Sequence, residues 1–419
     1  MTKRSLFLFA SALLLCVSCA PSSPRHKGGQ AVKTRAPHSA ETMMAPGKEV
    51  ATRGVIPPGT PAIKVALLVP LSGESAPLGT AMLDAANMAL YDSYLSVPSD
   101  QIHSQIVLLP KDSGSTPVDS ANVAEQAVAQ GVKFIVGPLF SQSVSQVKPV
   151  VQGRNIPILA FSNTKEIADS NTFIFGFLPE QQVQRMADYA FLNNYTRVAL
   201  LAPNDAYGQR IQERLLTVYG RKGGLVKPIE QYAPSPTNID AAVGRLAAFN
   251  DTNKDQAFQA IFIADGGYQL RNIISSIKKT NIDLNQIKLL GTGLWDDPEI
   301  AKIPEMRGAW FSSSTPSVAR SFENRFQVLY GYKPVRLASL AYDAVSQIAR
   351  ISLSQSSEQL DMSQLTDPEG FISPANGLVR LLPDGTNDRK LAIIEITPSG
   401  FKVIDSAPTS FKVPGQVLE

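Results

Sequence analysis

Lys64-Val65-Ala66-Leu67-Leu68-Val69-Pro70 occurs a second time in the chain, as Arg197-Val198-Ala199-Leu200-Leu201-Ala202-Pro203. In each copy a basic residue opens a run of apolar residues that a proline ends. An uninterrupted apolar run of this length is typical of a parallel strand that is buried on both faces. A helix-period pattern follows each copy, at 80–95 and at 209–219. The repeat therefore predicts two similar α/β lobes with a cleft between them.

Strand and helix patterns alternate along most of the chain. Such alternation predicts open parallel sheets with helices on both faces, that is, an α/β fold of two doubly wound lobes. For the first lobe we expect strands at 63–69, 105–109, 133–136 and 156–160, helices at 80–95, 118–130 and 144–152, and a short strand at 173–177 that crosses between the lobes. For the second we expect strands at 198–202, 225–232, 260–264 and 288–290 and helices at 209–219, 239–249 and 268–278.

The last part of the chain departs from this alternation. A strand at 309–312 and helices at 318–330 and 338–353 precede a loop or short helix at 354–368. Residues 377–382 and 390–396 are β-rich and flank the turn Pro383-Asp384-Gly385, which predicts a hairpin or a longer relative of one, with a third strand at 401–404. We therefore assign 63–178 and 309–372 to the first lobe and 179–308 and 373–411 to the second, with a hinge made of several crossings.

The first residues predict an export signal. Lys3 and Arg4 precede an apolar stretch at 6–17, which is too short to span a bilayer and suits a secretory signal peptide over 1–18. The stretch ends in Cys16-Val17-Ser18-Cys19, which resembles the lipobox of bacterial lipoproteins and implies lipidation of Cys19. Ala20 is similar to the sorting signal of outer-membrane lipoproteins, so we expect a periplasmic protein anchored there. The alternative is a plain signal peptide that is cut nearby.

Residues 19–62 predict a disordered linker, because they are rich in Pro, Ser, Gly, Thr and Ala and lack periodicity. The linker carries six basic and two acidic residues, whereas the whole chain has a net charge of +3. The basic charge thus belongs to the terminus, and we expect no nucleic-acid partner. Contact with a membrane is expected only through the lipid anchor. Weak attraction of the linker to anionic lipid or wall polymer is the alternative.

The titratable residues give no pattern for catalysis. Both cysteines lie at or before residue 19, which excludes disulfides, thiol catalysis and cysteine metal sites in the folded part. The histidines are His26, His38 and His103, too scattered for a catalytic triad or a metal cluster. Gly291-Thr292-Gly293 lacks the dinucleotide fingerprint, and no P-loop occurs. We predict no enzymatic activity, no metal and no cofactor, while hydrolysis by carboxylates alone stays open.

Several short motifs, in this order, resemble the type I periplasmic-binding fold, whose best-known branch is the leucine/branched-chain amino-acid-binding proteins. They are Pro70-Leu71-Ser72-Gly73, Val136-Gly137-Pro138 with Ser141 beyond it, Asp205-Ala206-Tyr207-Gly208 and Gly266-Gly267-Tyr268. A closer resemblance is to the penicillin-binding protein activator lipoproteins that share this fold. It rests on Gly137-Pro138-Leu139-Phe140, Ala160-Phe161-Ser162, the stretch 176–183, Gly291-Thr292-Gly293-Leu294-Trp295-Asp296-Asp297 and the stretch 337–344, and it covers nearly everything from Ile63 to about residue 411.

The two branches imply different functions. Relatives among the binding proteins capture a small-molecule ligand between the lobes and deliver it to a membrane transporter. The activators are outer-membrane lipoproteins that contact a peptidoglycan synthase, which implies a penicillin-binding protein as partner. Better-known activators carry an extra helical domain where this sequence has the linker. We favour the activator, because the motifs at 176–183 and 291–297 belong to that group.

Ligands of open α/β sheets bind beyond the carboxyl ends of the strands, where hydroxyls and backbone N–H groups suit an anion. The resemblance implies that the turns carrying Ser141 and 162–164 hold a ligand carboxylate, and that Tyr207 and Tyr268 pack on the ligand. The amino-acid-binding branch pairs the ligand ammonium with an acidic residue that is missing after 288–290; Asp265 or Asp296 takes its place, or no amino acid binds. The predicted ligand-binding residues are Ser72, Ser141, Ser162, Asn163, Thr164, Tyr207, Asp265, Tyr268 and Asp296, with turn capping as the alternative for each.

Overall fold

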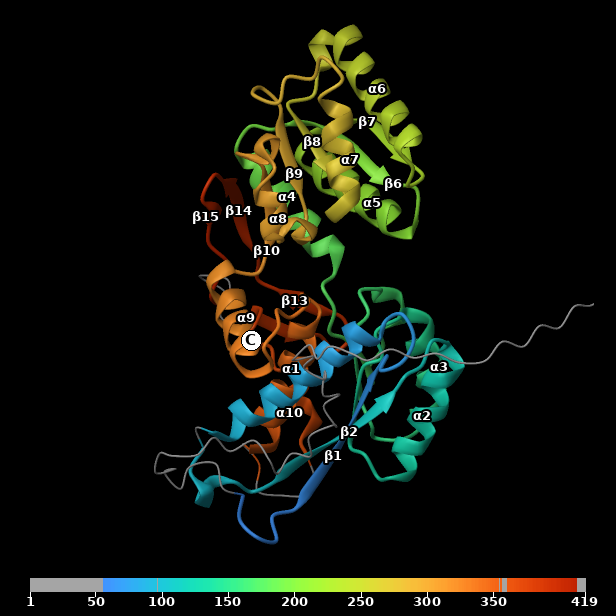
Figure 1. Ribbon diagram of the computed structural model, residues 1–419, viewed down its shortest axis with the longest axis vertical. Coiled ribbons are helices and arrows are strands. Elements are labelled where there is room, and N and C mark those ends of the chain that lie inside the picture. The colour runs from blue at the N-terminus through green and yellow to red at the C-terminus, as the bar shows by residue number, and fades with distance from the viewer. Residues whose placement is uncertain (1–55, 96, 354, 356–359, 413–419) are drawn as a thin grey trace, which may run out of the picture. The chain divides into compact units, whose positions relative to one another are not determined.

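The computed structural model describes residues 56–95, 97–353, 355 and 360–412 (Figure 1). They belong to one compact unit, Ala51–Glu419. The predicted signal peptide, the lipidation site Cys19 and the linker up to residue 55 lie outside the described residues. Within the described ranges, none of the helices has the length and apolarity that a bilayer crossing requires.

The first copy of the repeated stretch forms β1 (Ala62–Val69), which pairs in parallel with β2 (Gln105–Asp112) and β3 (Phe134–Val136). The sheet continues through β4 (Ile158–Ala160) to β5 (Thr172–Ile174), in the order β2-β1-β3-β4-β5. The strand expected at 173–177 is therefore β5. The prediction that it crosses between the lobes is wrong, because its backbone pairs with β4 and ends the first sheet.

The second copy forms β6 (Arg197–Pro203) and repeats this arrangement. It lies between β7 (Leu225–Tyr232) and β8 (Ala260–Ile263), and β9 (Lys288–Gly291) and β10 (Trp310–Ser313) extend the sheet. The order β7-β6-β8-β9-β10 matches the order of the first sheet strand for strand. The predicted pair of doubly wound α/β lobes is thus confirmed.

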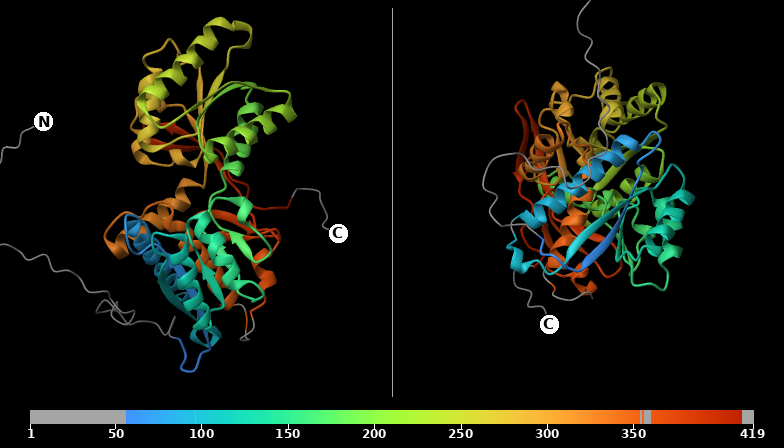
Figure 2. Two further views of the ribbon diagram at one scale, coloured as in Figure 1. Left: turned by 90° about the vertical axis from the view of Figure 1, so that its right-hand side faces the viewer. Right: turned by 60° about the horizontal axis from the view of Figure 1, so that its bottom comes forward.

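Both faces of the first sheet are buried, as the uninterrupted apolar run predicts. Val65, Leu67 and Val69 face a core shared with two helices, whereas Ala66 and Leu68 face the opposite core. Successive side chains of a strand point to opposite faces, so each face needs apolar residues of its own. The layers can be followed in Figure 2. The first core holds α1 (Ala76–Leu95) and α10 (Ala338–Leu353), and the opposite core holds α2 (Pro117–Ala129) and α3 (Ser141–Val151).

The second sheet is covered in the same way. Ala199 and Leu201 of β6 face one core, and Val198 and Leu200 face the other. One of the covering helices, Pro179–Leu192, was not predicted from the sequence, although its buried Val183, Met186 and Ala190 follow a helical period. The covering helices are α6 (Pro236–Thr252) and α7 (Gly267–Ile277) on one face, and α4 (Pro179–Leu192) and α5 (Ala206–Lys222) on the other.

A glycine in the first turns of the helix after each repeat allows that helix to approach the strand closely. A Cβ atom on Gly79 would lie 1.8 Å from the carbonyl oxygen of Pro70, and one on Gly208 would lie 1.9 Å from that of Pro203. Both prolines end the repeated stretch. The two copies therefore share both their sequence and the close contact between the end of the strand and the helix that follows it.

The chain crosses between the lobes at points that differ from the predicted division. β10 (Trp310–Ser313) pairs with β9 in the second sheet, whereas the residues from 309 were expected in the first lobe. Conversely, Val379 and Leu381, expected in the second lobe, pack in the first core. Strand-forming residues show that a strand exists but not which sheet it joins, since pairing partners are set by tertiary structure. Helix α9 (Pro316–Tyr330) joins α10 on the first core, and α8 (Pro298–Ala301) lies in the second lobe.

The expected hairpin forms with a different partner. In the described residues, a small antiparallel sheet consists of β11 (Phe371–Ser373), β12 (Gly377–Leu381) and β13 (Asn387–Arg389). The predicted turn connects β12 to β13, so these two strands form the hairpin. The segment expected to close the hairpin forms β14 (Ala392–Thr397), which runs antiparallel to β10 and pairs with β15 (Gly400–Asp405). The last two strands thus extend the second sheet.

Candidate functional site

A pocket of about 370 Å³ lies beyond the carboxyl ends of β2, β3 and β4. Four of the predicted residues, Ser141, Ser162, Asn163 and Thr164, line it together. Its position is the one expected for a ligand of a doubly wound sheet, and its volume suits a small molecule. The remaining lining residues are Ser115, Pro117, Leu139, Phe140, Gln142 and Ser143.

One wall of the pocket is the first turn of α3. Phe140 precedes this helix at the N-cap position and offers no side-chain acceptor to its first N–H groups. The first N–H groups of a helix have no partner within the helix, and the helix dipole favours an anion beside them. Gly137 lets the backbone before α3 pass close to β1. Its φ is 94°, and a Cβ atom at this position would lie 2.2 Å from the carbonyl oxygen of Leu68.

Ser143 also lines the pocket and was not predicted from the sequence. Its side chain is only 5% exposed, lines the pocket and makes no hydrogen bond within the described part of the chain. Its oxygen is not among the fully buried atoms that lack a partner, so this hydroxyl faces the pocket and is open to a ligand oxygen or to water. Ser162 differs, because its hydroxyl already accepts a 3.1 Å hydrogen bond from the N–H of Thr164. No local signal identified Ser143, since residues two positions apart in a helix do not share a face.

Ser72 lies in the turn after β1 and not in the pocket lining. It hydrogen-bonds the carboxylate of Asp112, which also accepts from the N–H groups of Leu71 and Gly114 at 2.8 and 2.9 Å. The alternative of turn capping therefore describes what Ser72 does here.

The other predicted residues lie in the second lobe, outside the pocket lining. The Tyr207 hydroxyl lies 3.1 Å from that of Thr292, and burial raises the pKa of Tyr207 to about 12. Asp265 accepts a 2.7 Å hydrogen bond from Tyr232, and burial raises the pKa of this carboxyl. The side chain of Tyr268 is 72% exposed.

Asp296, the last of the predicted residues, is paired within the protein. It accepts a 2.7 Å hydrogen bond from the hydroxyl of Ser313, and Arg336 Nε lies 4.0 Å from its carboxylate. The Arg336 guanidinium also stacks on the ring of Phe177 at 4.2 Å. The carboxylate of Asp296 therefore already has a cation and a hydroxyl donor.

Arg210 of α5 links the second lobe to the pocket wall. Its Nη1 atom donates a 2.7 Å hydrogen bond to the backbone carbonyl of Asn163. Glu180, at the start of α4, lies 4.0 Å from Arg210 and 3.6 Å from Lys165, and neither of its buried carboxylate oxygens accepts a hydrogen bond among the described residues. Arg210 was not predicted from the sequence, although it lies one helical turn beyond the predicted Tyr207.

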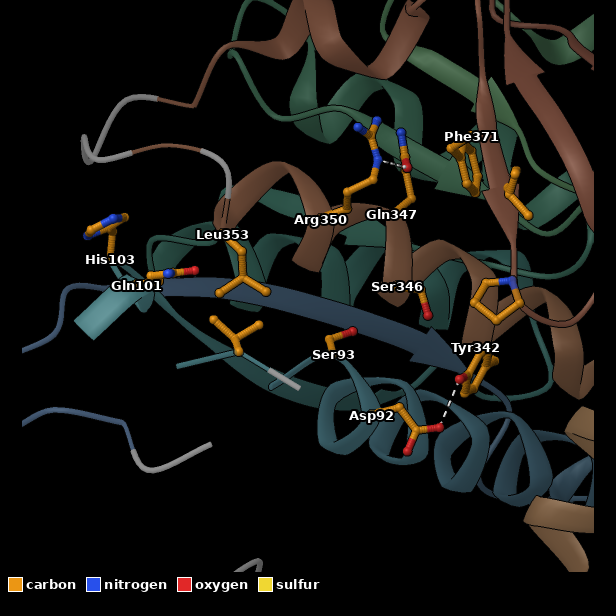
Figure 3. A pocket seen from close by; sticks show the side chains of 13 residues that line it. Asp92, Ser93, Gln101, His103, Tyr342, Ser346, Gln347, Arg350, Leu353 and Phe371 are labelled. Carbon is orange, nitrogen blue, oxygen red and sulfur yellow. Dashed lines mark hydrogen bonds between the residues drawn. The ribbon is translucent and has the colours of Figure 1, made fainter. Parts of the chain in front are cut away.

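A second and larger cavity, of about 900 Å³, lies in the first lobe between α1, α10 and β11 (Figure 3). Ser93 and Ser346 reach into it from the two helices, and His103 lies at its end. The Tyr342 hydroxyl donates to Asp92 at 2.8 Å. The described residues bring together no group of three acidic, histidine or cysteine side chains that would suit a metal ion.

Comparisons with known proteins agree with this architecture. The sequence pattern of the family described as periplasmic binding protein matches residues 62–378. The chain is 28% identical over 232 residues to an uncharacterised protein of Rickettsia prowazekii. The aligned residues are 54% of this chain and 59% of that protein. It is 30% identical over 150 residues to the penicillin-binding protein activator LpoA of Haemophilus ducreyi. The aligned residues are 36% of this chain and 24% of the activator. The match thus spans about a quarter of the activator's length.

Among solved structures, a branched-chain amino acid ABC transporter periplasmic ligand-binding protein from Burkholderia xenovorans superposes with a TM-score of 0.67 at 16% identity. The superposition covers 82% of this chain and 94% of that one. At this identity the likeness shows the fold alone. With the family pattern spanning both lobes and the solved fold in agreement, the chain belongs to the periplasmic binding protein family and has its two-lobed type I fold.

Proposed function

We propose that this protein is a non-catalytic periplasmic lipoprotein, anchored through Cys19 to the outer membrane, that regulates a peptidoglycan synthase. The observation that carries the proposal is the similarity to proteins named penicillin-binding protein activators, at 30% identity over 150 residues in one and 26% over 153 residues in another. Because the match spans about a quarter of each activator, the activity and the partner belong to the proposal.

The acidic groups near the cleft also support a role other than an amino-acid receptor. A receptor for amino acids needs a free carboxylate for the ligand ammonium. Asp296 is paired with Arg336, Asp265 accepts from Tyr232, and Glu180 lies between two cations. Asp296 and Asp265 thus already have donors inside the protein, and the two cations beside Glu180 repel an ammonium group.

Capture of a synthase tests the proposal directly. The full chain, immobilised, is expected to retain a purified bifunctional penicillin-binding protein, and the soluble chain is expected to increase the rate at which that enzyme polymerises glycan. A second form that lacks residues 19–55 shows whether the linker contributes to the contact. Absence of both capture and stimulation with the full chain would contradict the proposal.

Membrane fractionation tests the anchor. The chain with Cys19 is expected in the outer-membrane fraction, whereas a Cys19→Ser chain is expected in the soluble periplasmic fraction, because lipid addition requires the thiol. Equal distribution of the two forms would argue for a plain signal peptide.

The pocket favours a second candidate, a substrate-binding protein of an ABC transporter. Its hydroxyls and the open first turn of α3 form a site of suitable size for a small carboxylate. Calorimetric titration with leucine, valine and polar amino acids distinguishes the two. Micromolar binding favours the receptor, and no heat of binding favours the activator.

A further inference from the structure

The 900 Å³ cavity lies in the first lobe and shares no lining residue with the pocket at the carboxyl ends of the strands (Figure 3). Helices α1 and α10 pack closely through the apolar side chains that they contribute to the first core. Where they line the cavity they present Ser93 and Ser346 instead. Two such small side chains leave space that larger ones would fill, and the volume suits a small organic molecule.

Gln347 is a buried amide that reaches this cavity. Its side chain is 1% exposed, and its Oε1 atom accepts a 2.9 Å hydrogen bond from Nε of Arg350. The Nε2 atom donates to no group in the described ranges, and it is not among the fully buried atoms without a partner. This amide nitrogen therefore faces the cavity, where its N–H groups are open to an acceptor on a ligand.

Arg350 gives the same side of the cavity a positive charge. Its guanidinium lies beside the Gln347 amide, and both residues belong to the lining (Figure 3). Asp92 is the one carboxylate among the lining residues. Arg325 Nε donates to both oxygens of Asp92, at 2.9 and 2.7 Å, and the Tyr342 hydroxyl donates to it at 2.8 Å. The charge of Asp92 is thus balanced from α9, whereas the charge of Arg350 is not balanced within the lining.

The remaining side of the cavity is apolar. Ile372, in the edge strand β11, has a side chain that is 77% exposed and belongs to the lining. A ligand with an apolar body would remove this side chain from water, which is favourable in proportion to the area covered. The other apolar lining residues are Val97, Leu353, Phe371 and Pro374.

From these features we infer that the cavity is a second binding site, for a small organic carboxylate with an apolar body. The carboxylate accepts hydrogen bonds from Arg350 and from the Gln347 amide, and the apolar body covers Ile372 and Leu353. One unbalanced cation matches a single negative charge, which favours a carboxylate over a phosphate monoester. The site lies within the first lobe, so the inference goes beyond the proposed function and does not depend on it.

Calorimetric titration of the full chain tests the inference with ligands that share one apolar chain and differ in the polar group. Octanoate is expected to bind about tenfold more tightly than octanamide, because its hydrogen bonds are charge-assisted. Octylammonium is expected to bind more weakly than both, since Arg350 repels it. Absence of octanoate binding, or equal affinities for the three ligands, overturns the inference.

A change at Arg350 assigns the charge preference to this residue. Arg350→Gln is expected to lower the affinity for octanoate about tenfold and to bring it near that of octanamide. Arg154→Gln is the matched control, because Arg154 is exposed in the turn after α3 and lines neither pocket. It removes the same charge from the protein and is expected to leave both affinities unchanged. An unchanged preference for octanoate in the Arg350→Gln protein overturns the assignment.

A change at Ser346 locates the ligand. Ser346→Phe places a ring in the cavity and is expected to abolish binding of octanoate and of octanamide. Ser143→Ala, in the other pocket, is expected to leave both affinities unchanged. Circular dichroism shows that each variant is folded. Octanoate binding that survives both Arg350→Gln and Ser346→Phe lies elsewhere in the protein and overturns the inference.

Discussion

The side-chain oxygen of Gln182 accepts a 2.7 Å hydrogen bond from the backbone N–H of Gly293, and both groups are buried. The backbone carbonyl of Gln182 accepts from the hydroxyl of Ser312 at 2.8 Å. Gln182 thus joins helix α4, which follows the first crossing between the lobes, to β10 and to the turn after β9. A Cβ on Gly293 would lie 2.8 Å from a guanidinium nitrogen of Arg336, so a larger residue in this turn would have to displace the end of that side chain.

Replacing Gln182 with leucine is expected to lower the free energy of unfolding by about 1–3 kcal/mol, because the N–H of Gly293 remains buried without an acceptor. Urea denaturation followed by circular dichroism measures this. Gln209→Ala, on the exposed face of α5, serves as the control and is expected to change the free energy by less than about 0.5 kcal/mol. Equal effects of the two variants would contradict the account.

The two glycines that follow the repeats are expected to be intolerant of a methyl group. Gly208→Ala places a Cβ within 1.9 Å of the Pro203 carbonyl oxygen, and relief of that contact moves the helix off the strand. We expect a loss of about 2 kcal/mol or more in the free energy of unfolding. Gly244→Ala in α6 is the matched control, because nothing lies within 4 Å of its Cβ position. There a gain of up to about 1 kcal/mol is expected from helix propensity alone.

Phe411 returns the chain from the second sheet to the first lobe. Its ring lies 4.3 Å from the Arg380 guanidinium carbon and 4.4 Å from the Lys390 ammonium nitrogen, and the next residue, Lys412, forms an ion pair with Glu369. Two exposed cation–π contacts contribute about 1–2 kcal/mol together. Phe411→Ala is expected to lower the free energy of unfolding by that amount.

Phe411→Leu separates the cation–π part from apolar contact, because it keeps an apolar side chain and removes the aromatic face. It is expected to recover less than half of the loss in chemical denaturation. Full recovery with leucine would show that the two cations contribute nothing to holding this segment.

The pKa of Asp265 predicts a pH-dependent difference in stability. Burial raises this pKa above its ordinary value, although the Tyr232 hydroxyl and the Gly266 N–H favour the charged form and oppose the shift. A carboxyl whose pKa is higher in the folded chain stabilises the fold fully below its unfolded pKa of about 3.9 and loses that contribution as the pH rises through the folded value.

The free energy of unfolding of the wild type, relative to Asp265→Asn, is therefore expected to fall as the pH is raised from about 4 towards neutrality. Denaturation curves of both proteins over this range measure the difference. A difference that rises with pH would show that the hydrogen bonds outweigh burial at this carboxyl.

Local sequence patterns predicted most of the fold. The repeated stretch, buried on both faces, could only be an inner strand of a covered sheet, since neither face of it offers a polar residue to solvent. Its two copies predicted the two lobes, and Ser141 with the turn 162–164 predicted the pocket, because the carboxyl ends of neighbouring parallel strands meet at one edge.

The same patterns failed where distant segments had to choose a partner. The sequence predicts strands at 309–312 and 390–396, but only the folded chain pairs them with each other, as β10 and β14 of the second sheet. Arg210 lies 47 positions from Asn163 along the chain, and no local pattern connects them. Hydrophobic periodicity acts over a few residues and is written in the sequence, whereas sheet membership and the contact between Arg210 and the pocket depend on tertiary packing, which brings together segments that share no local signal.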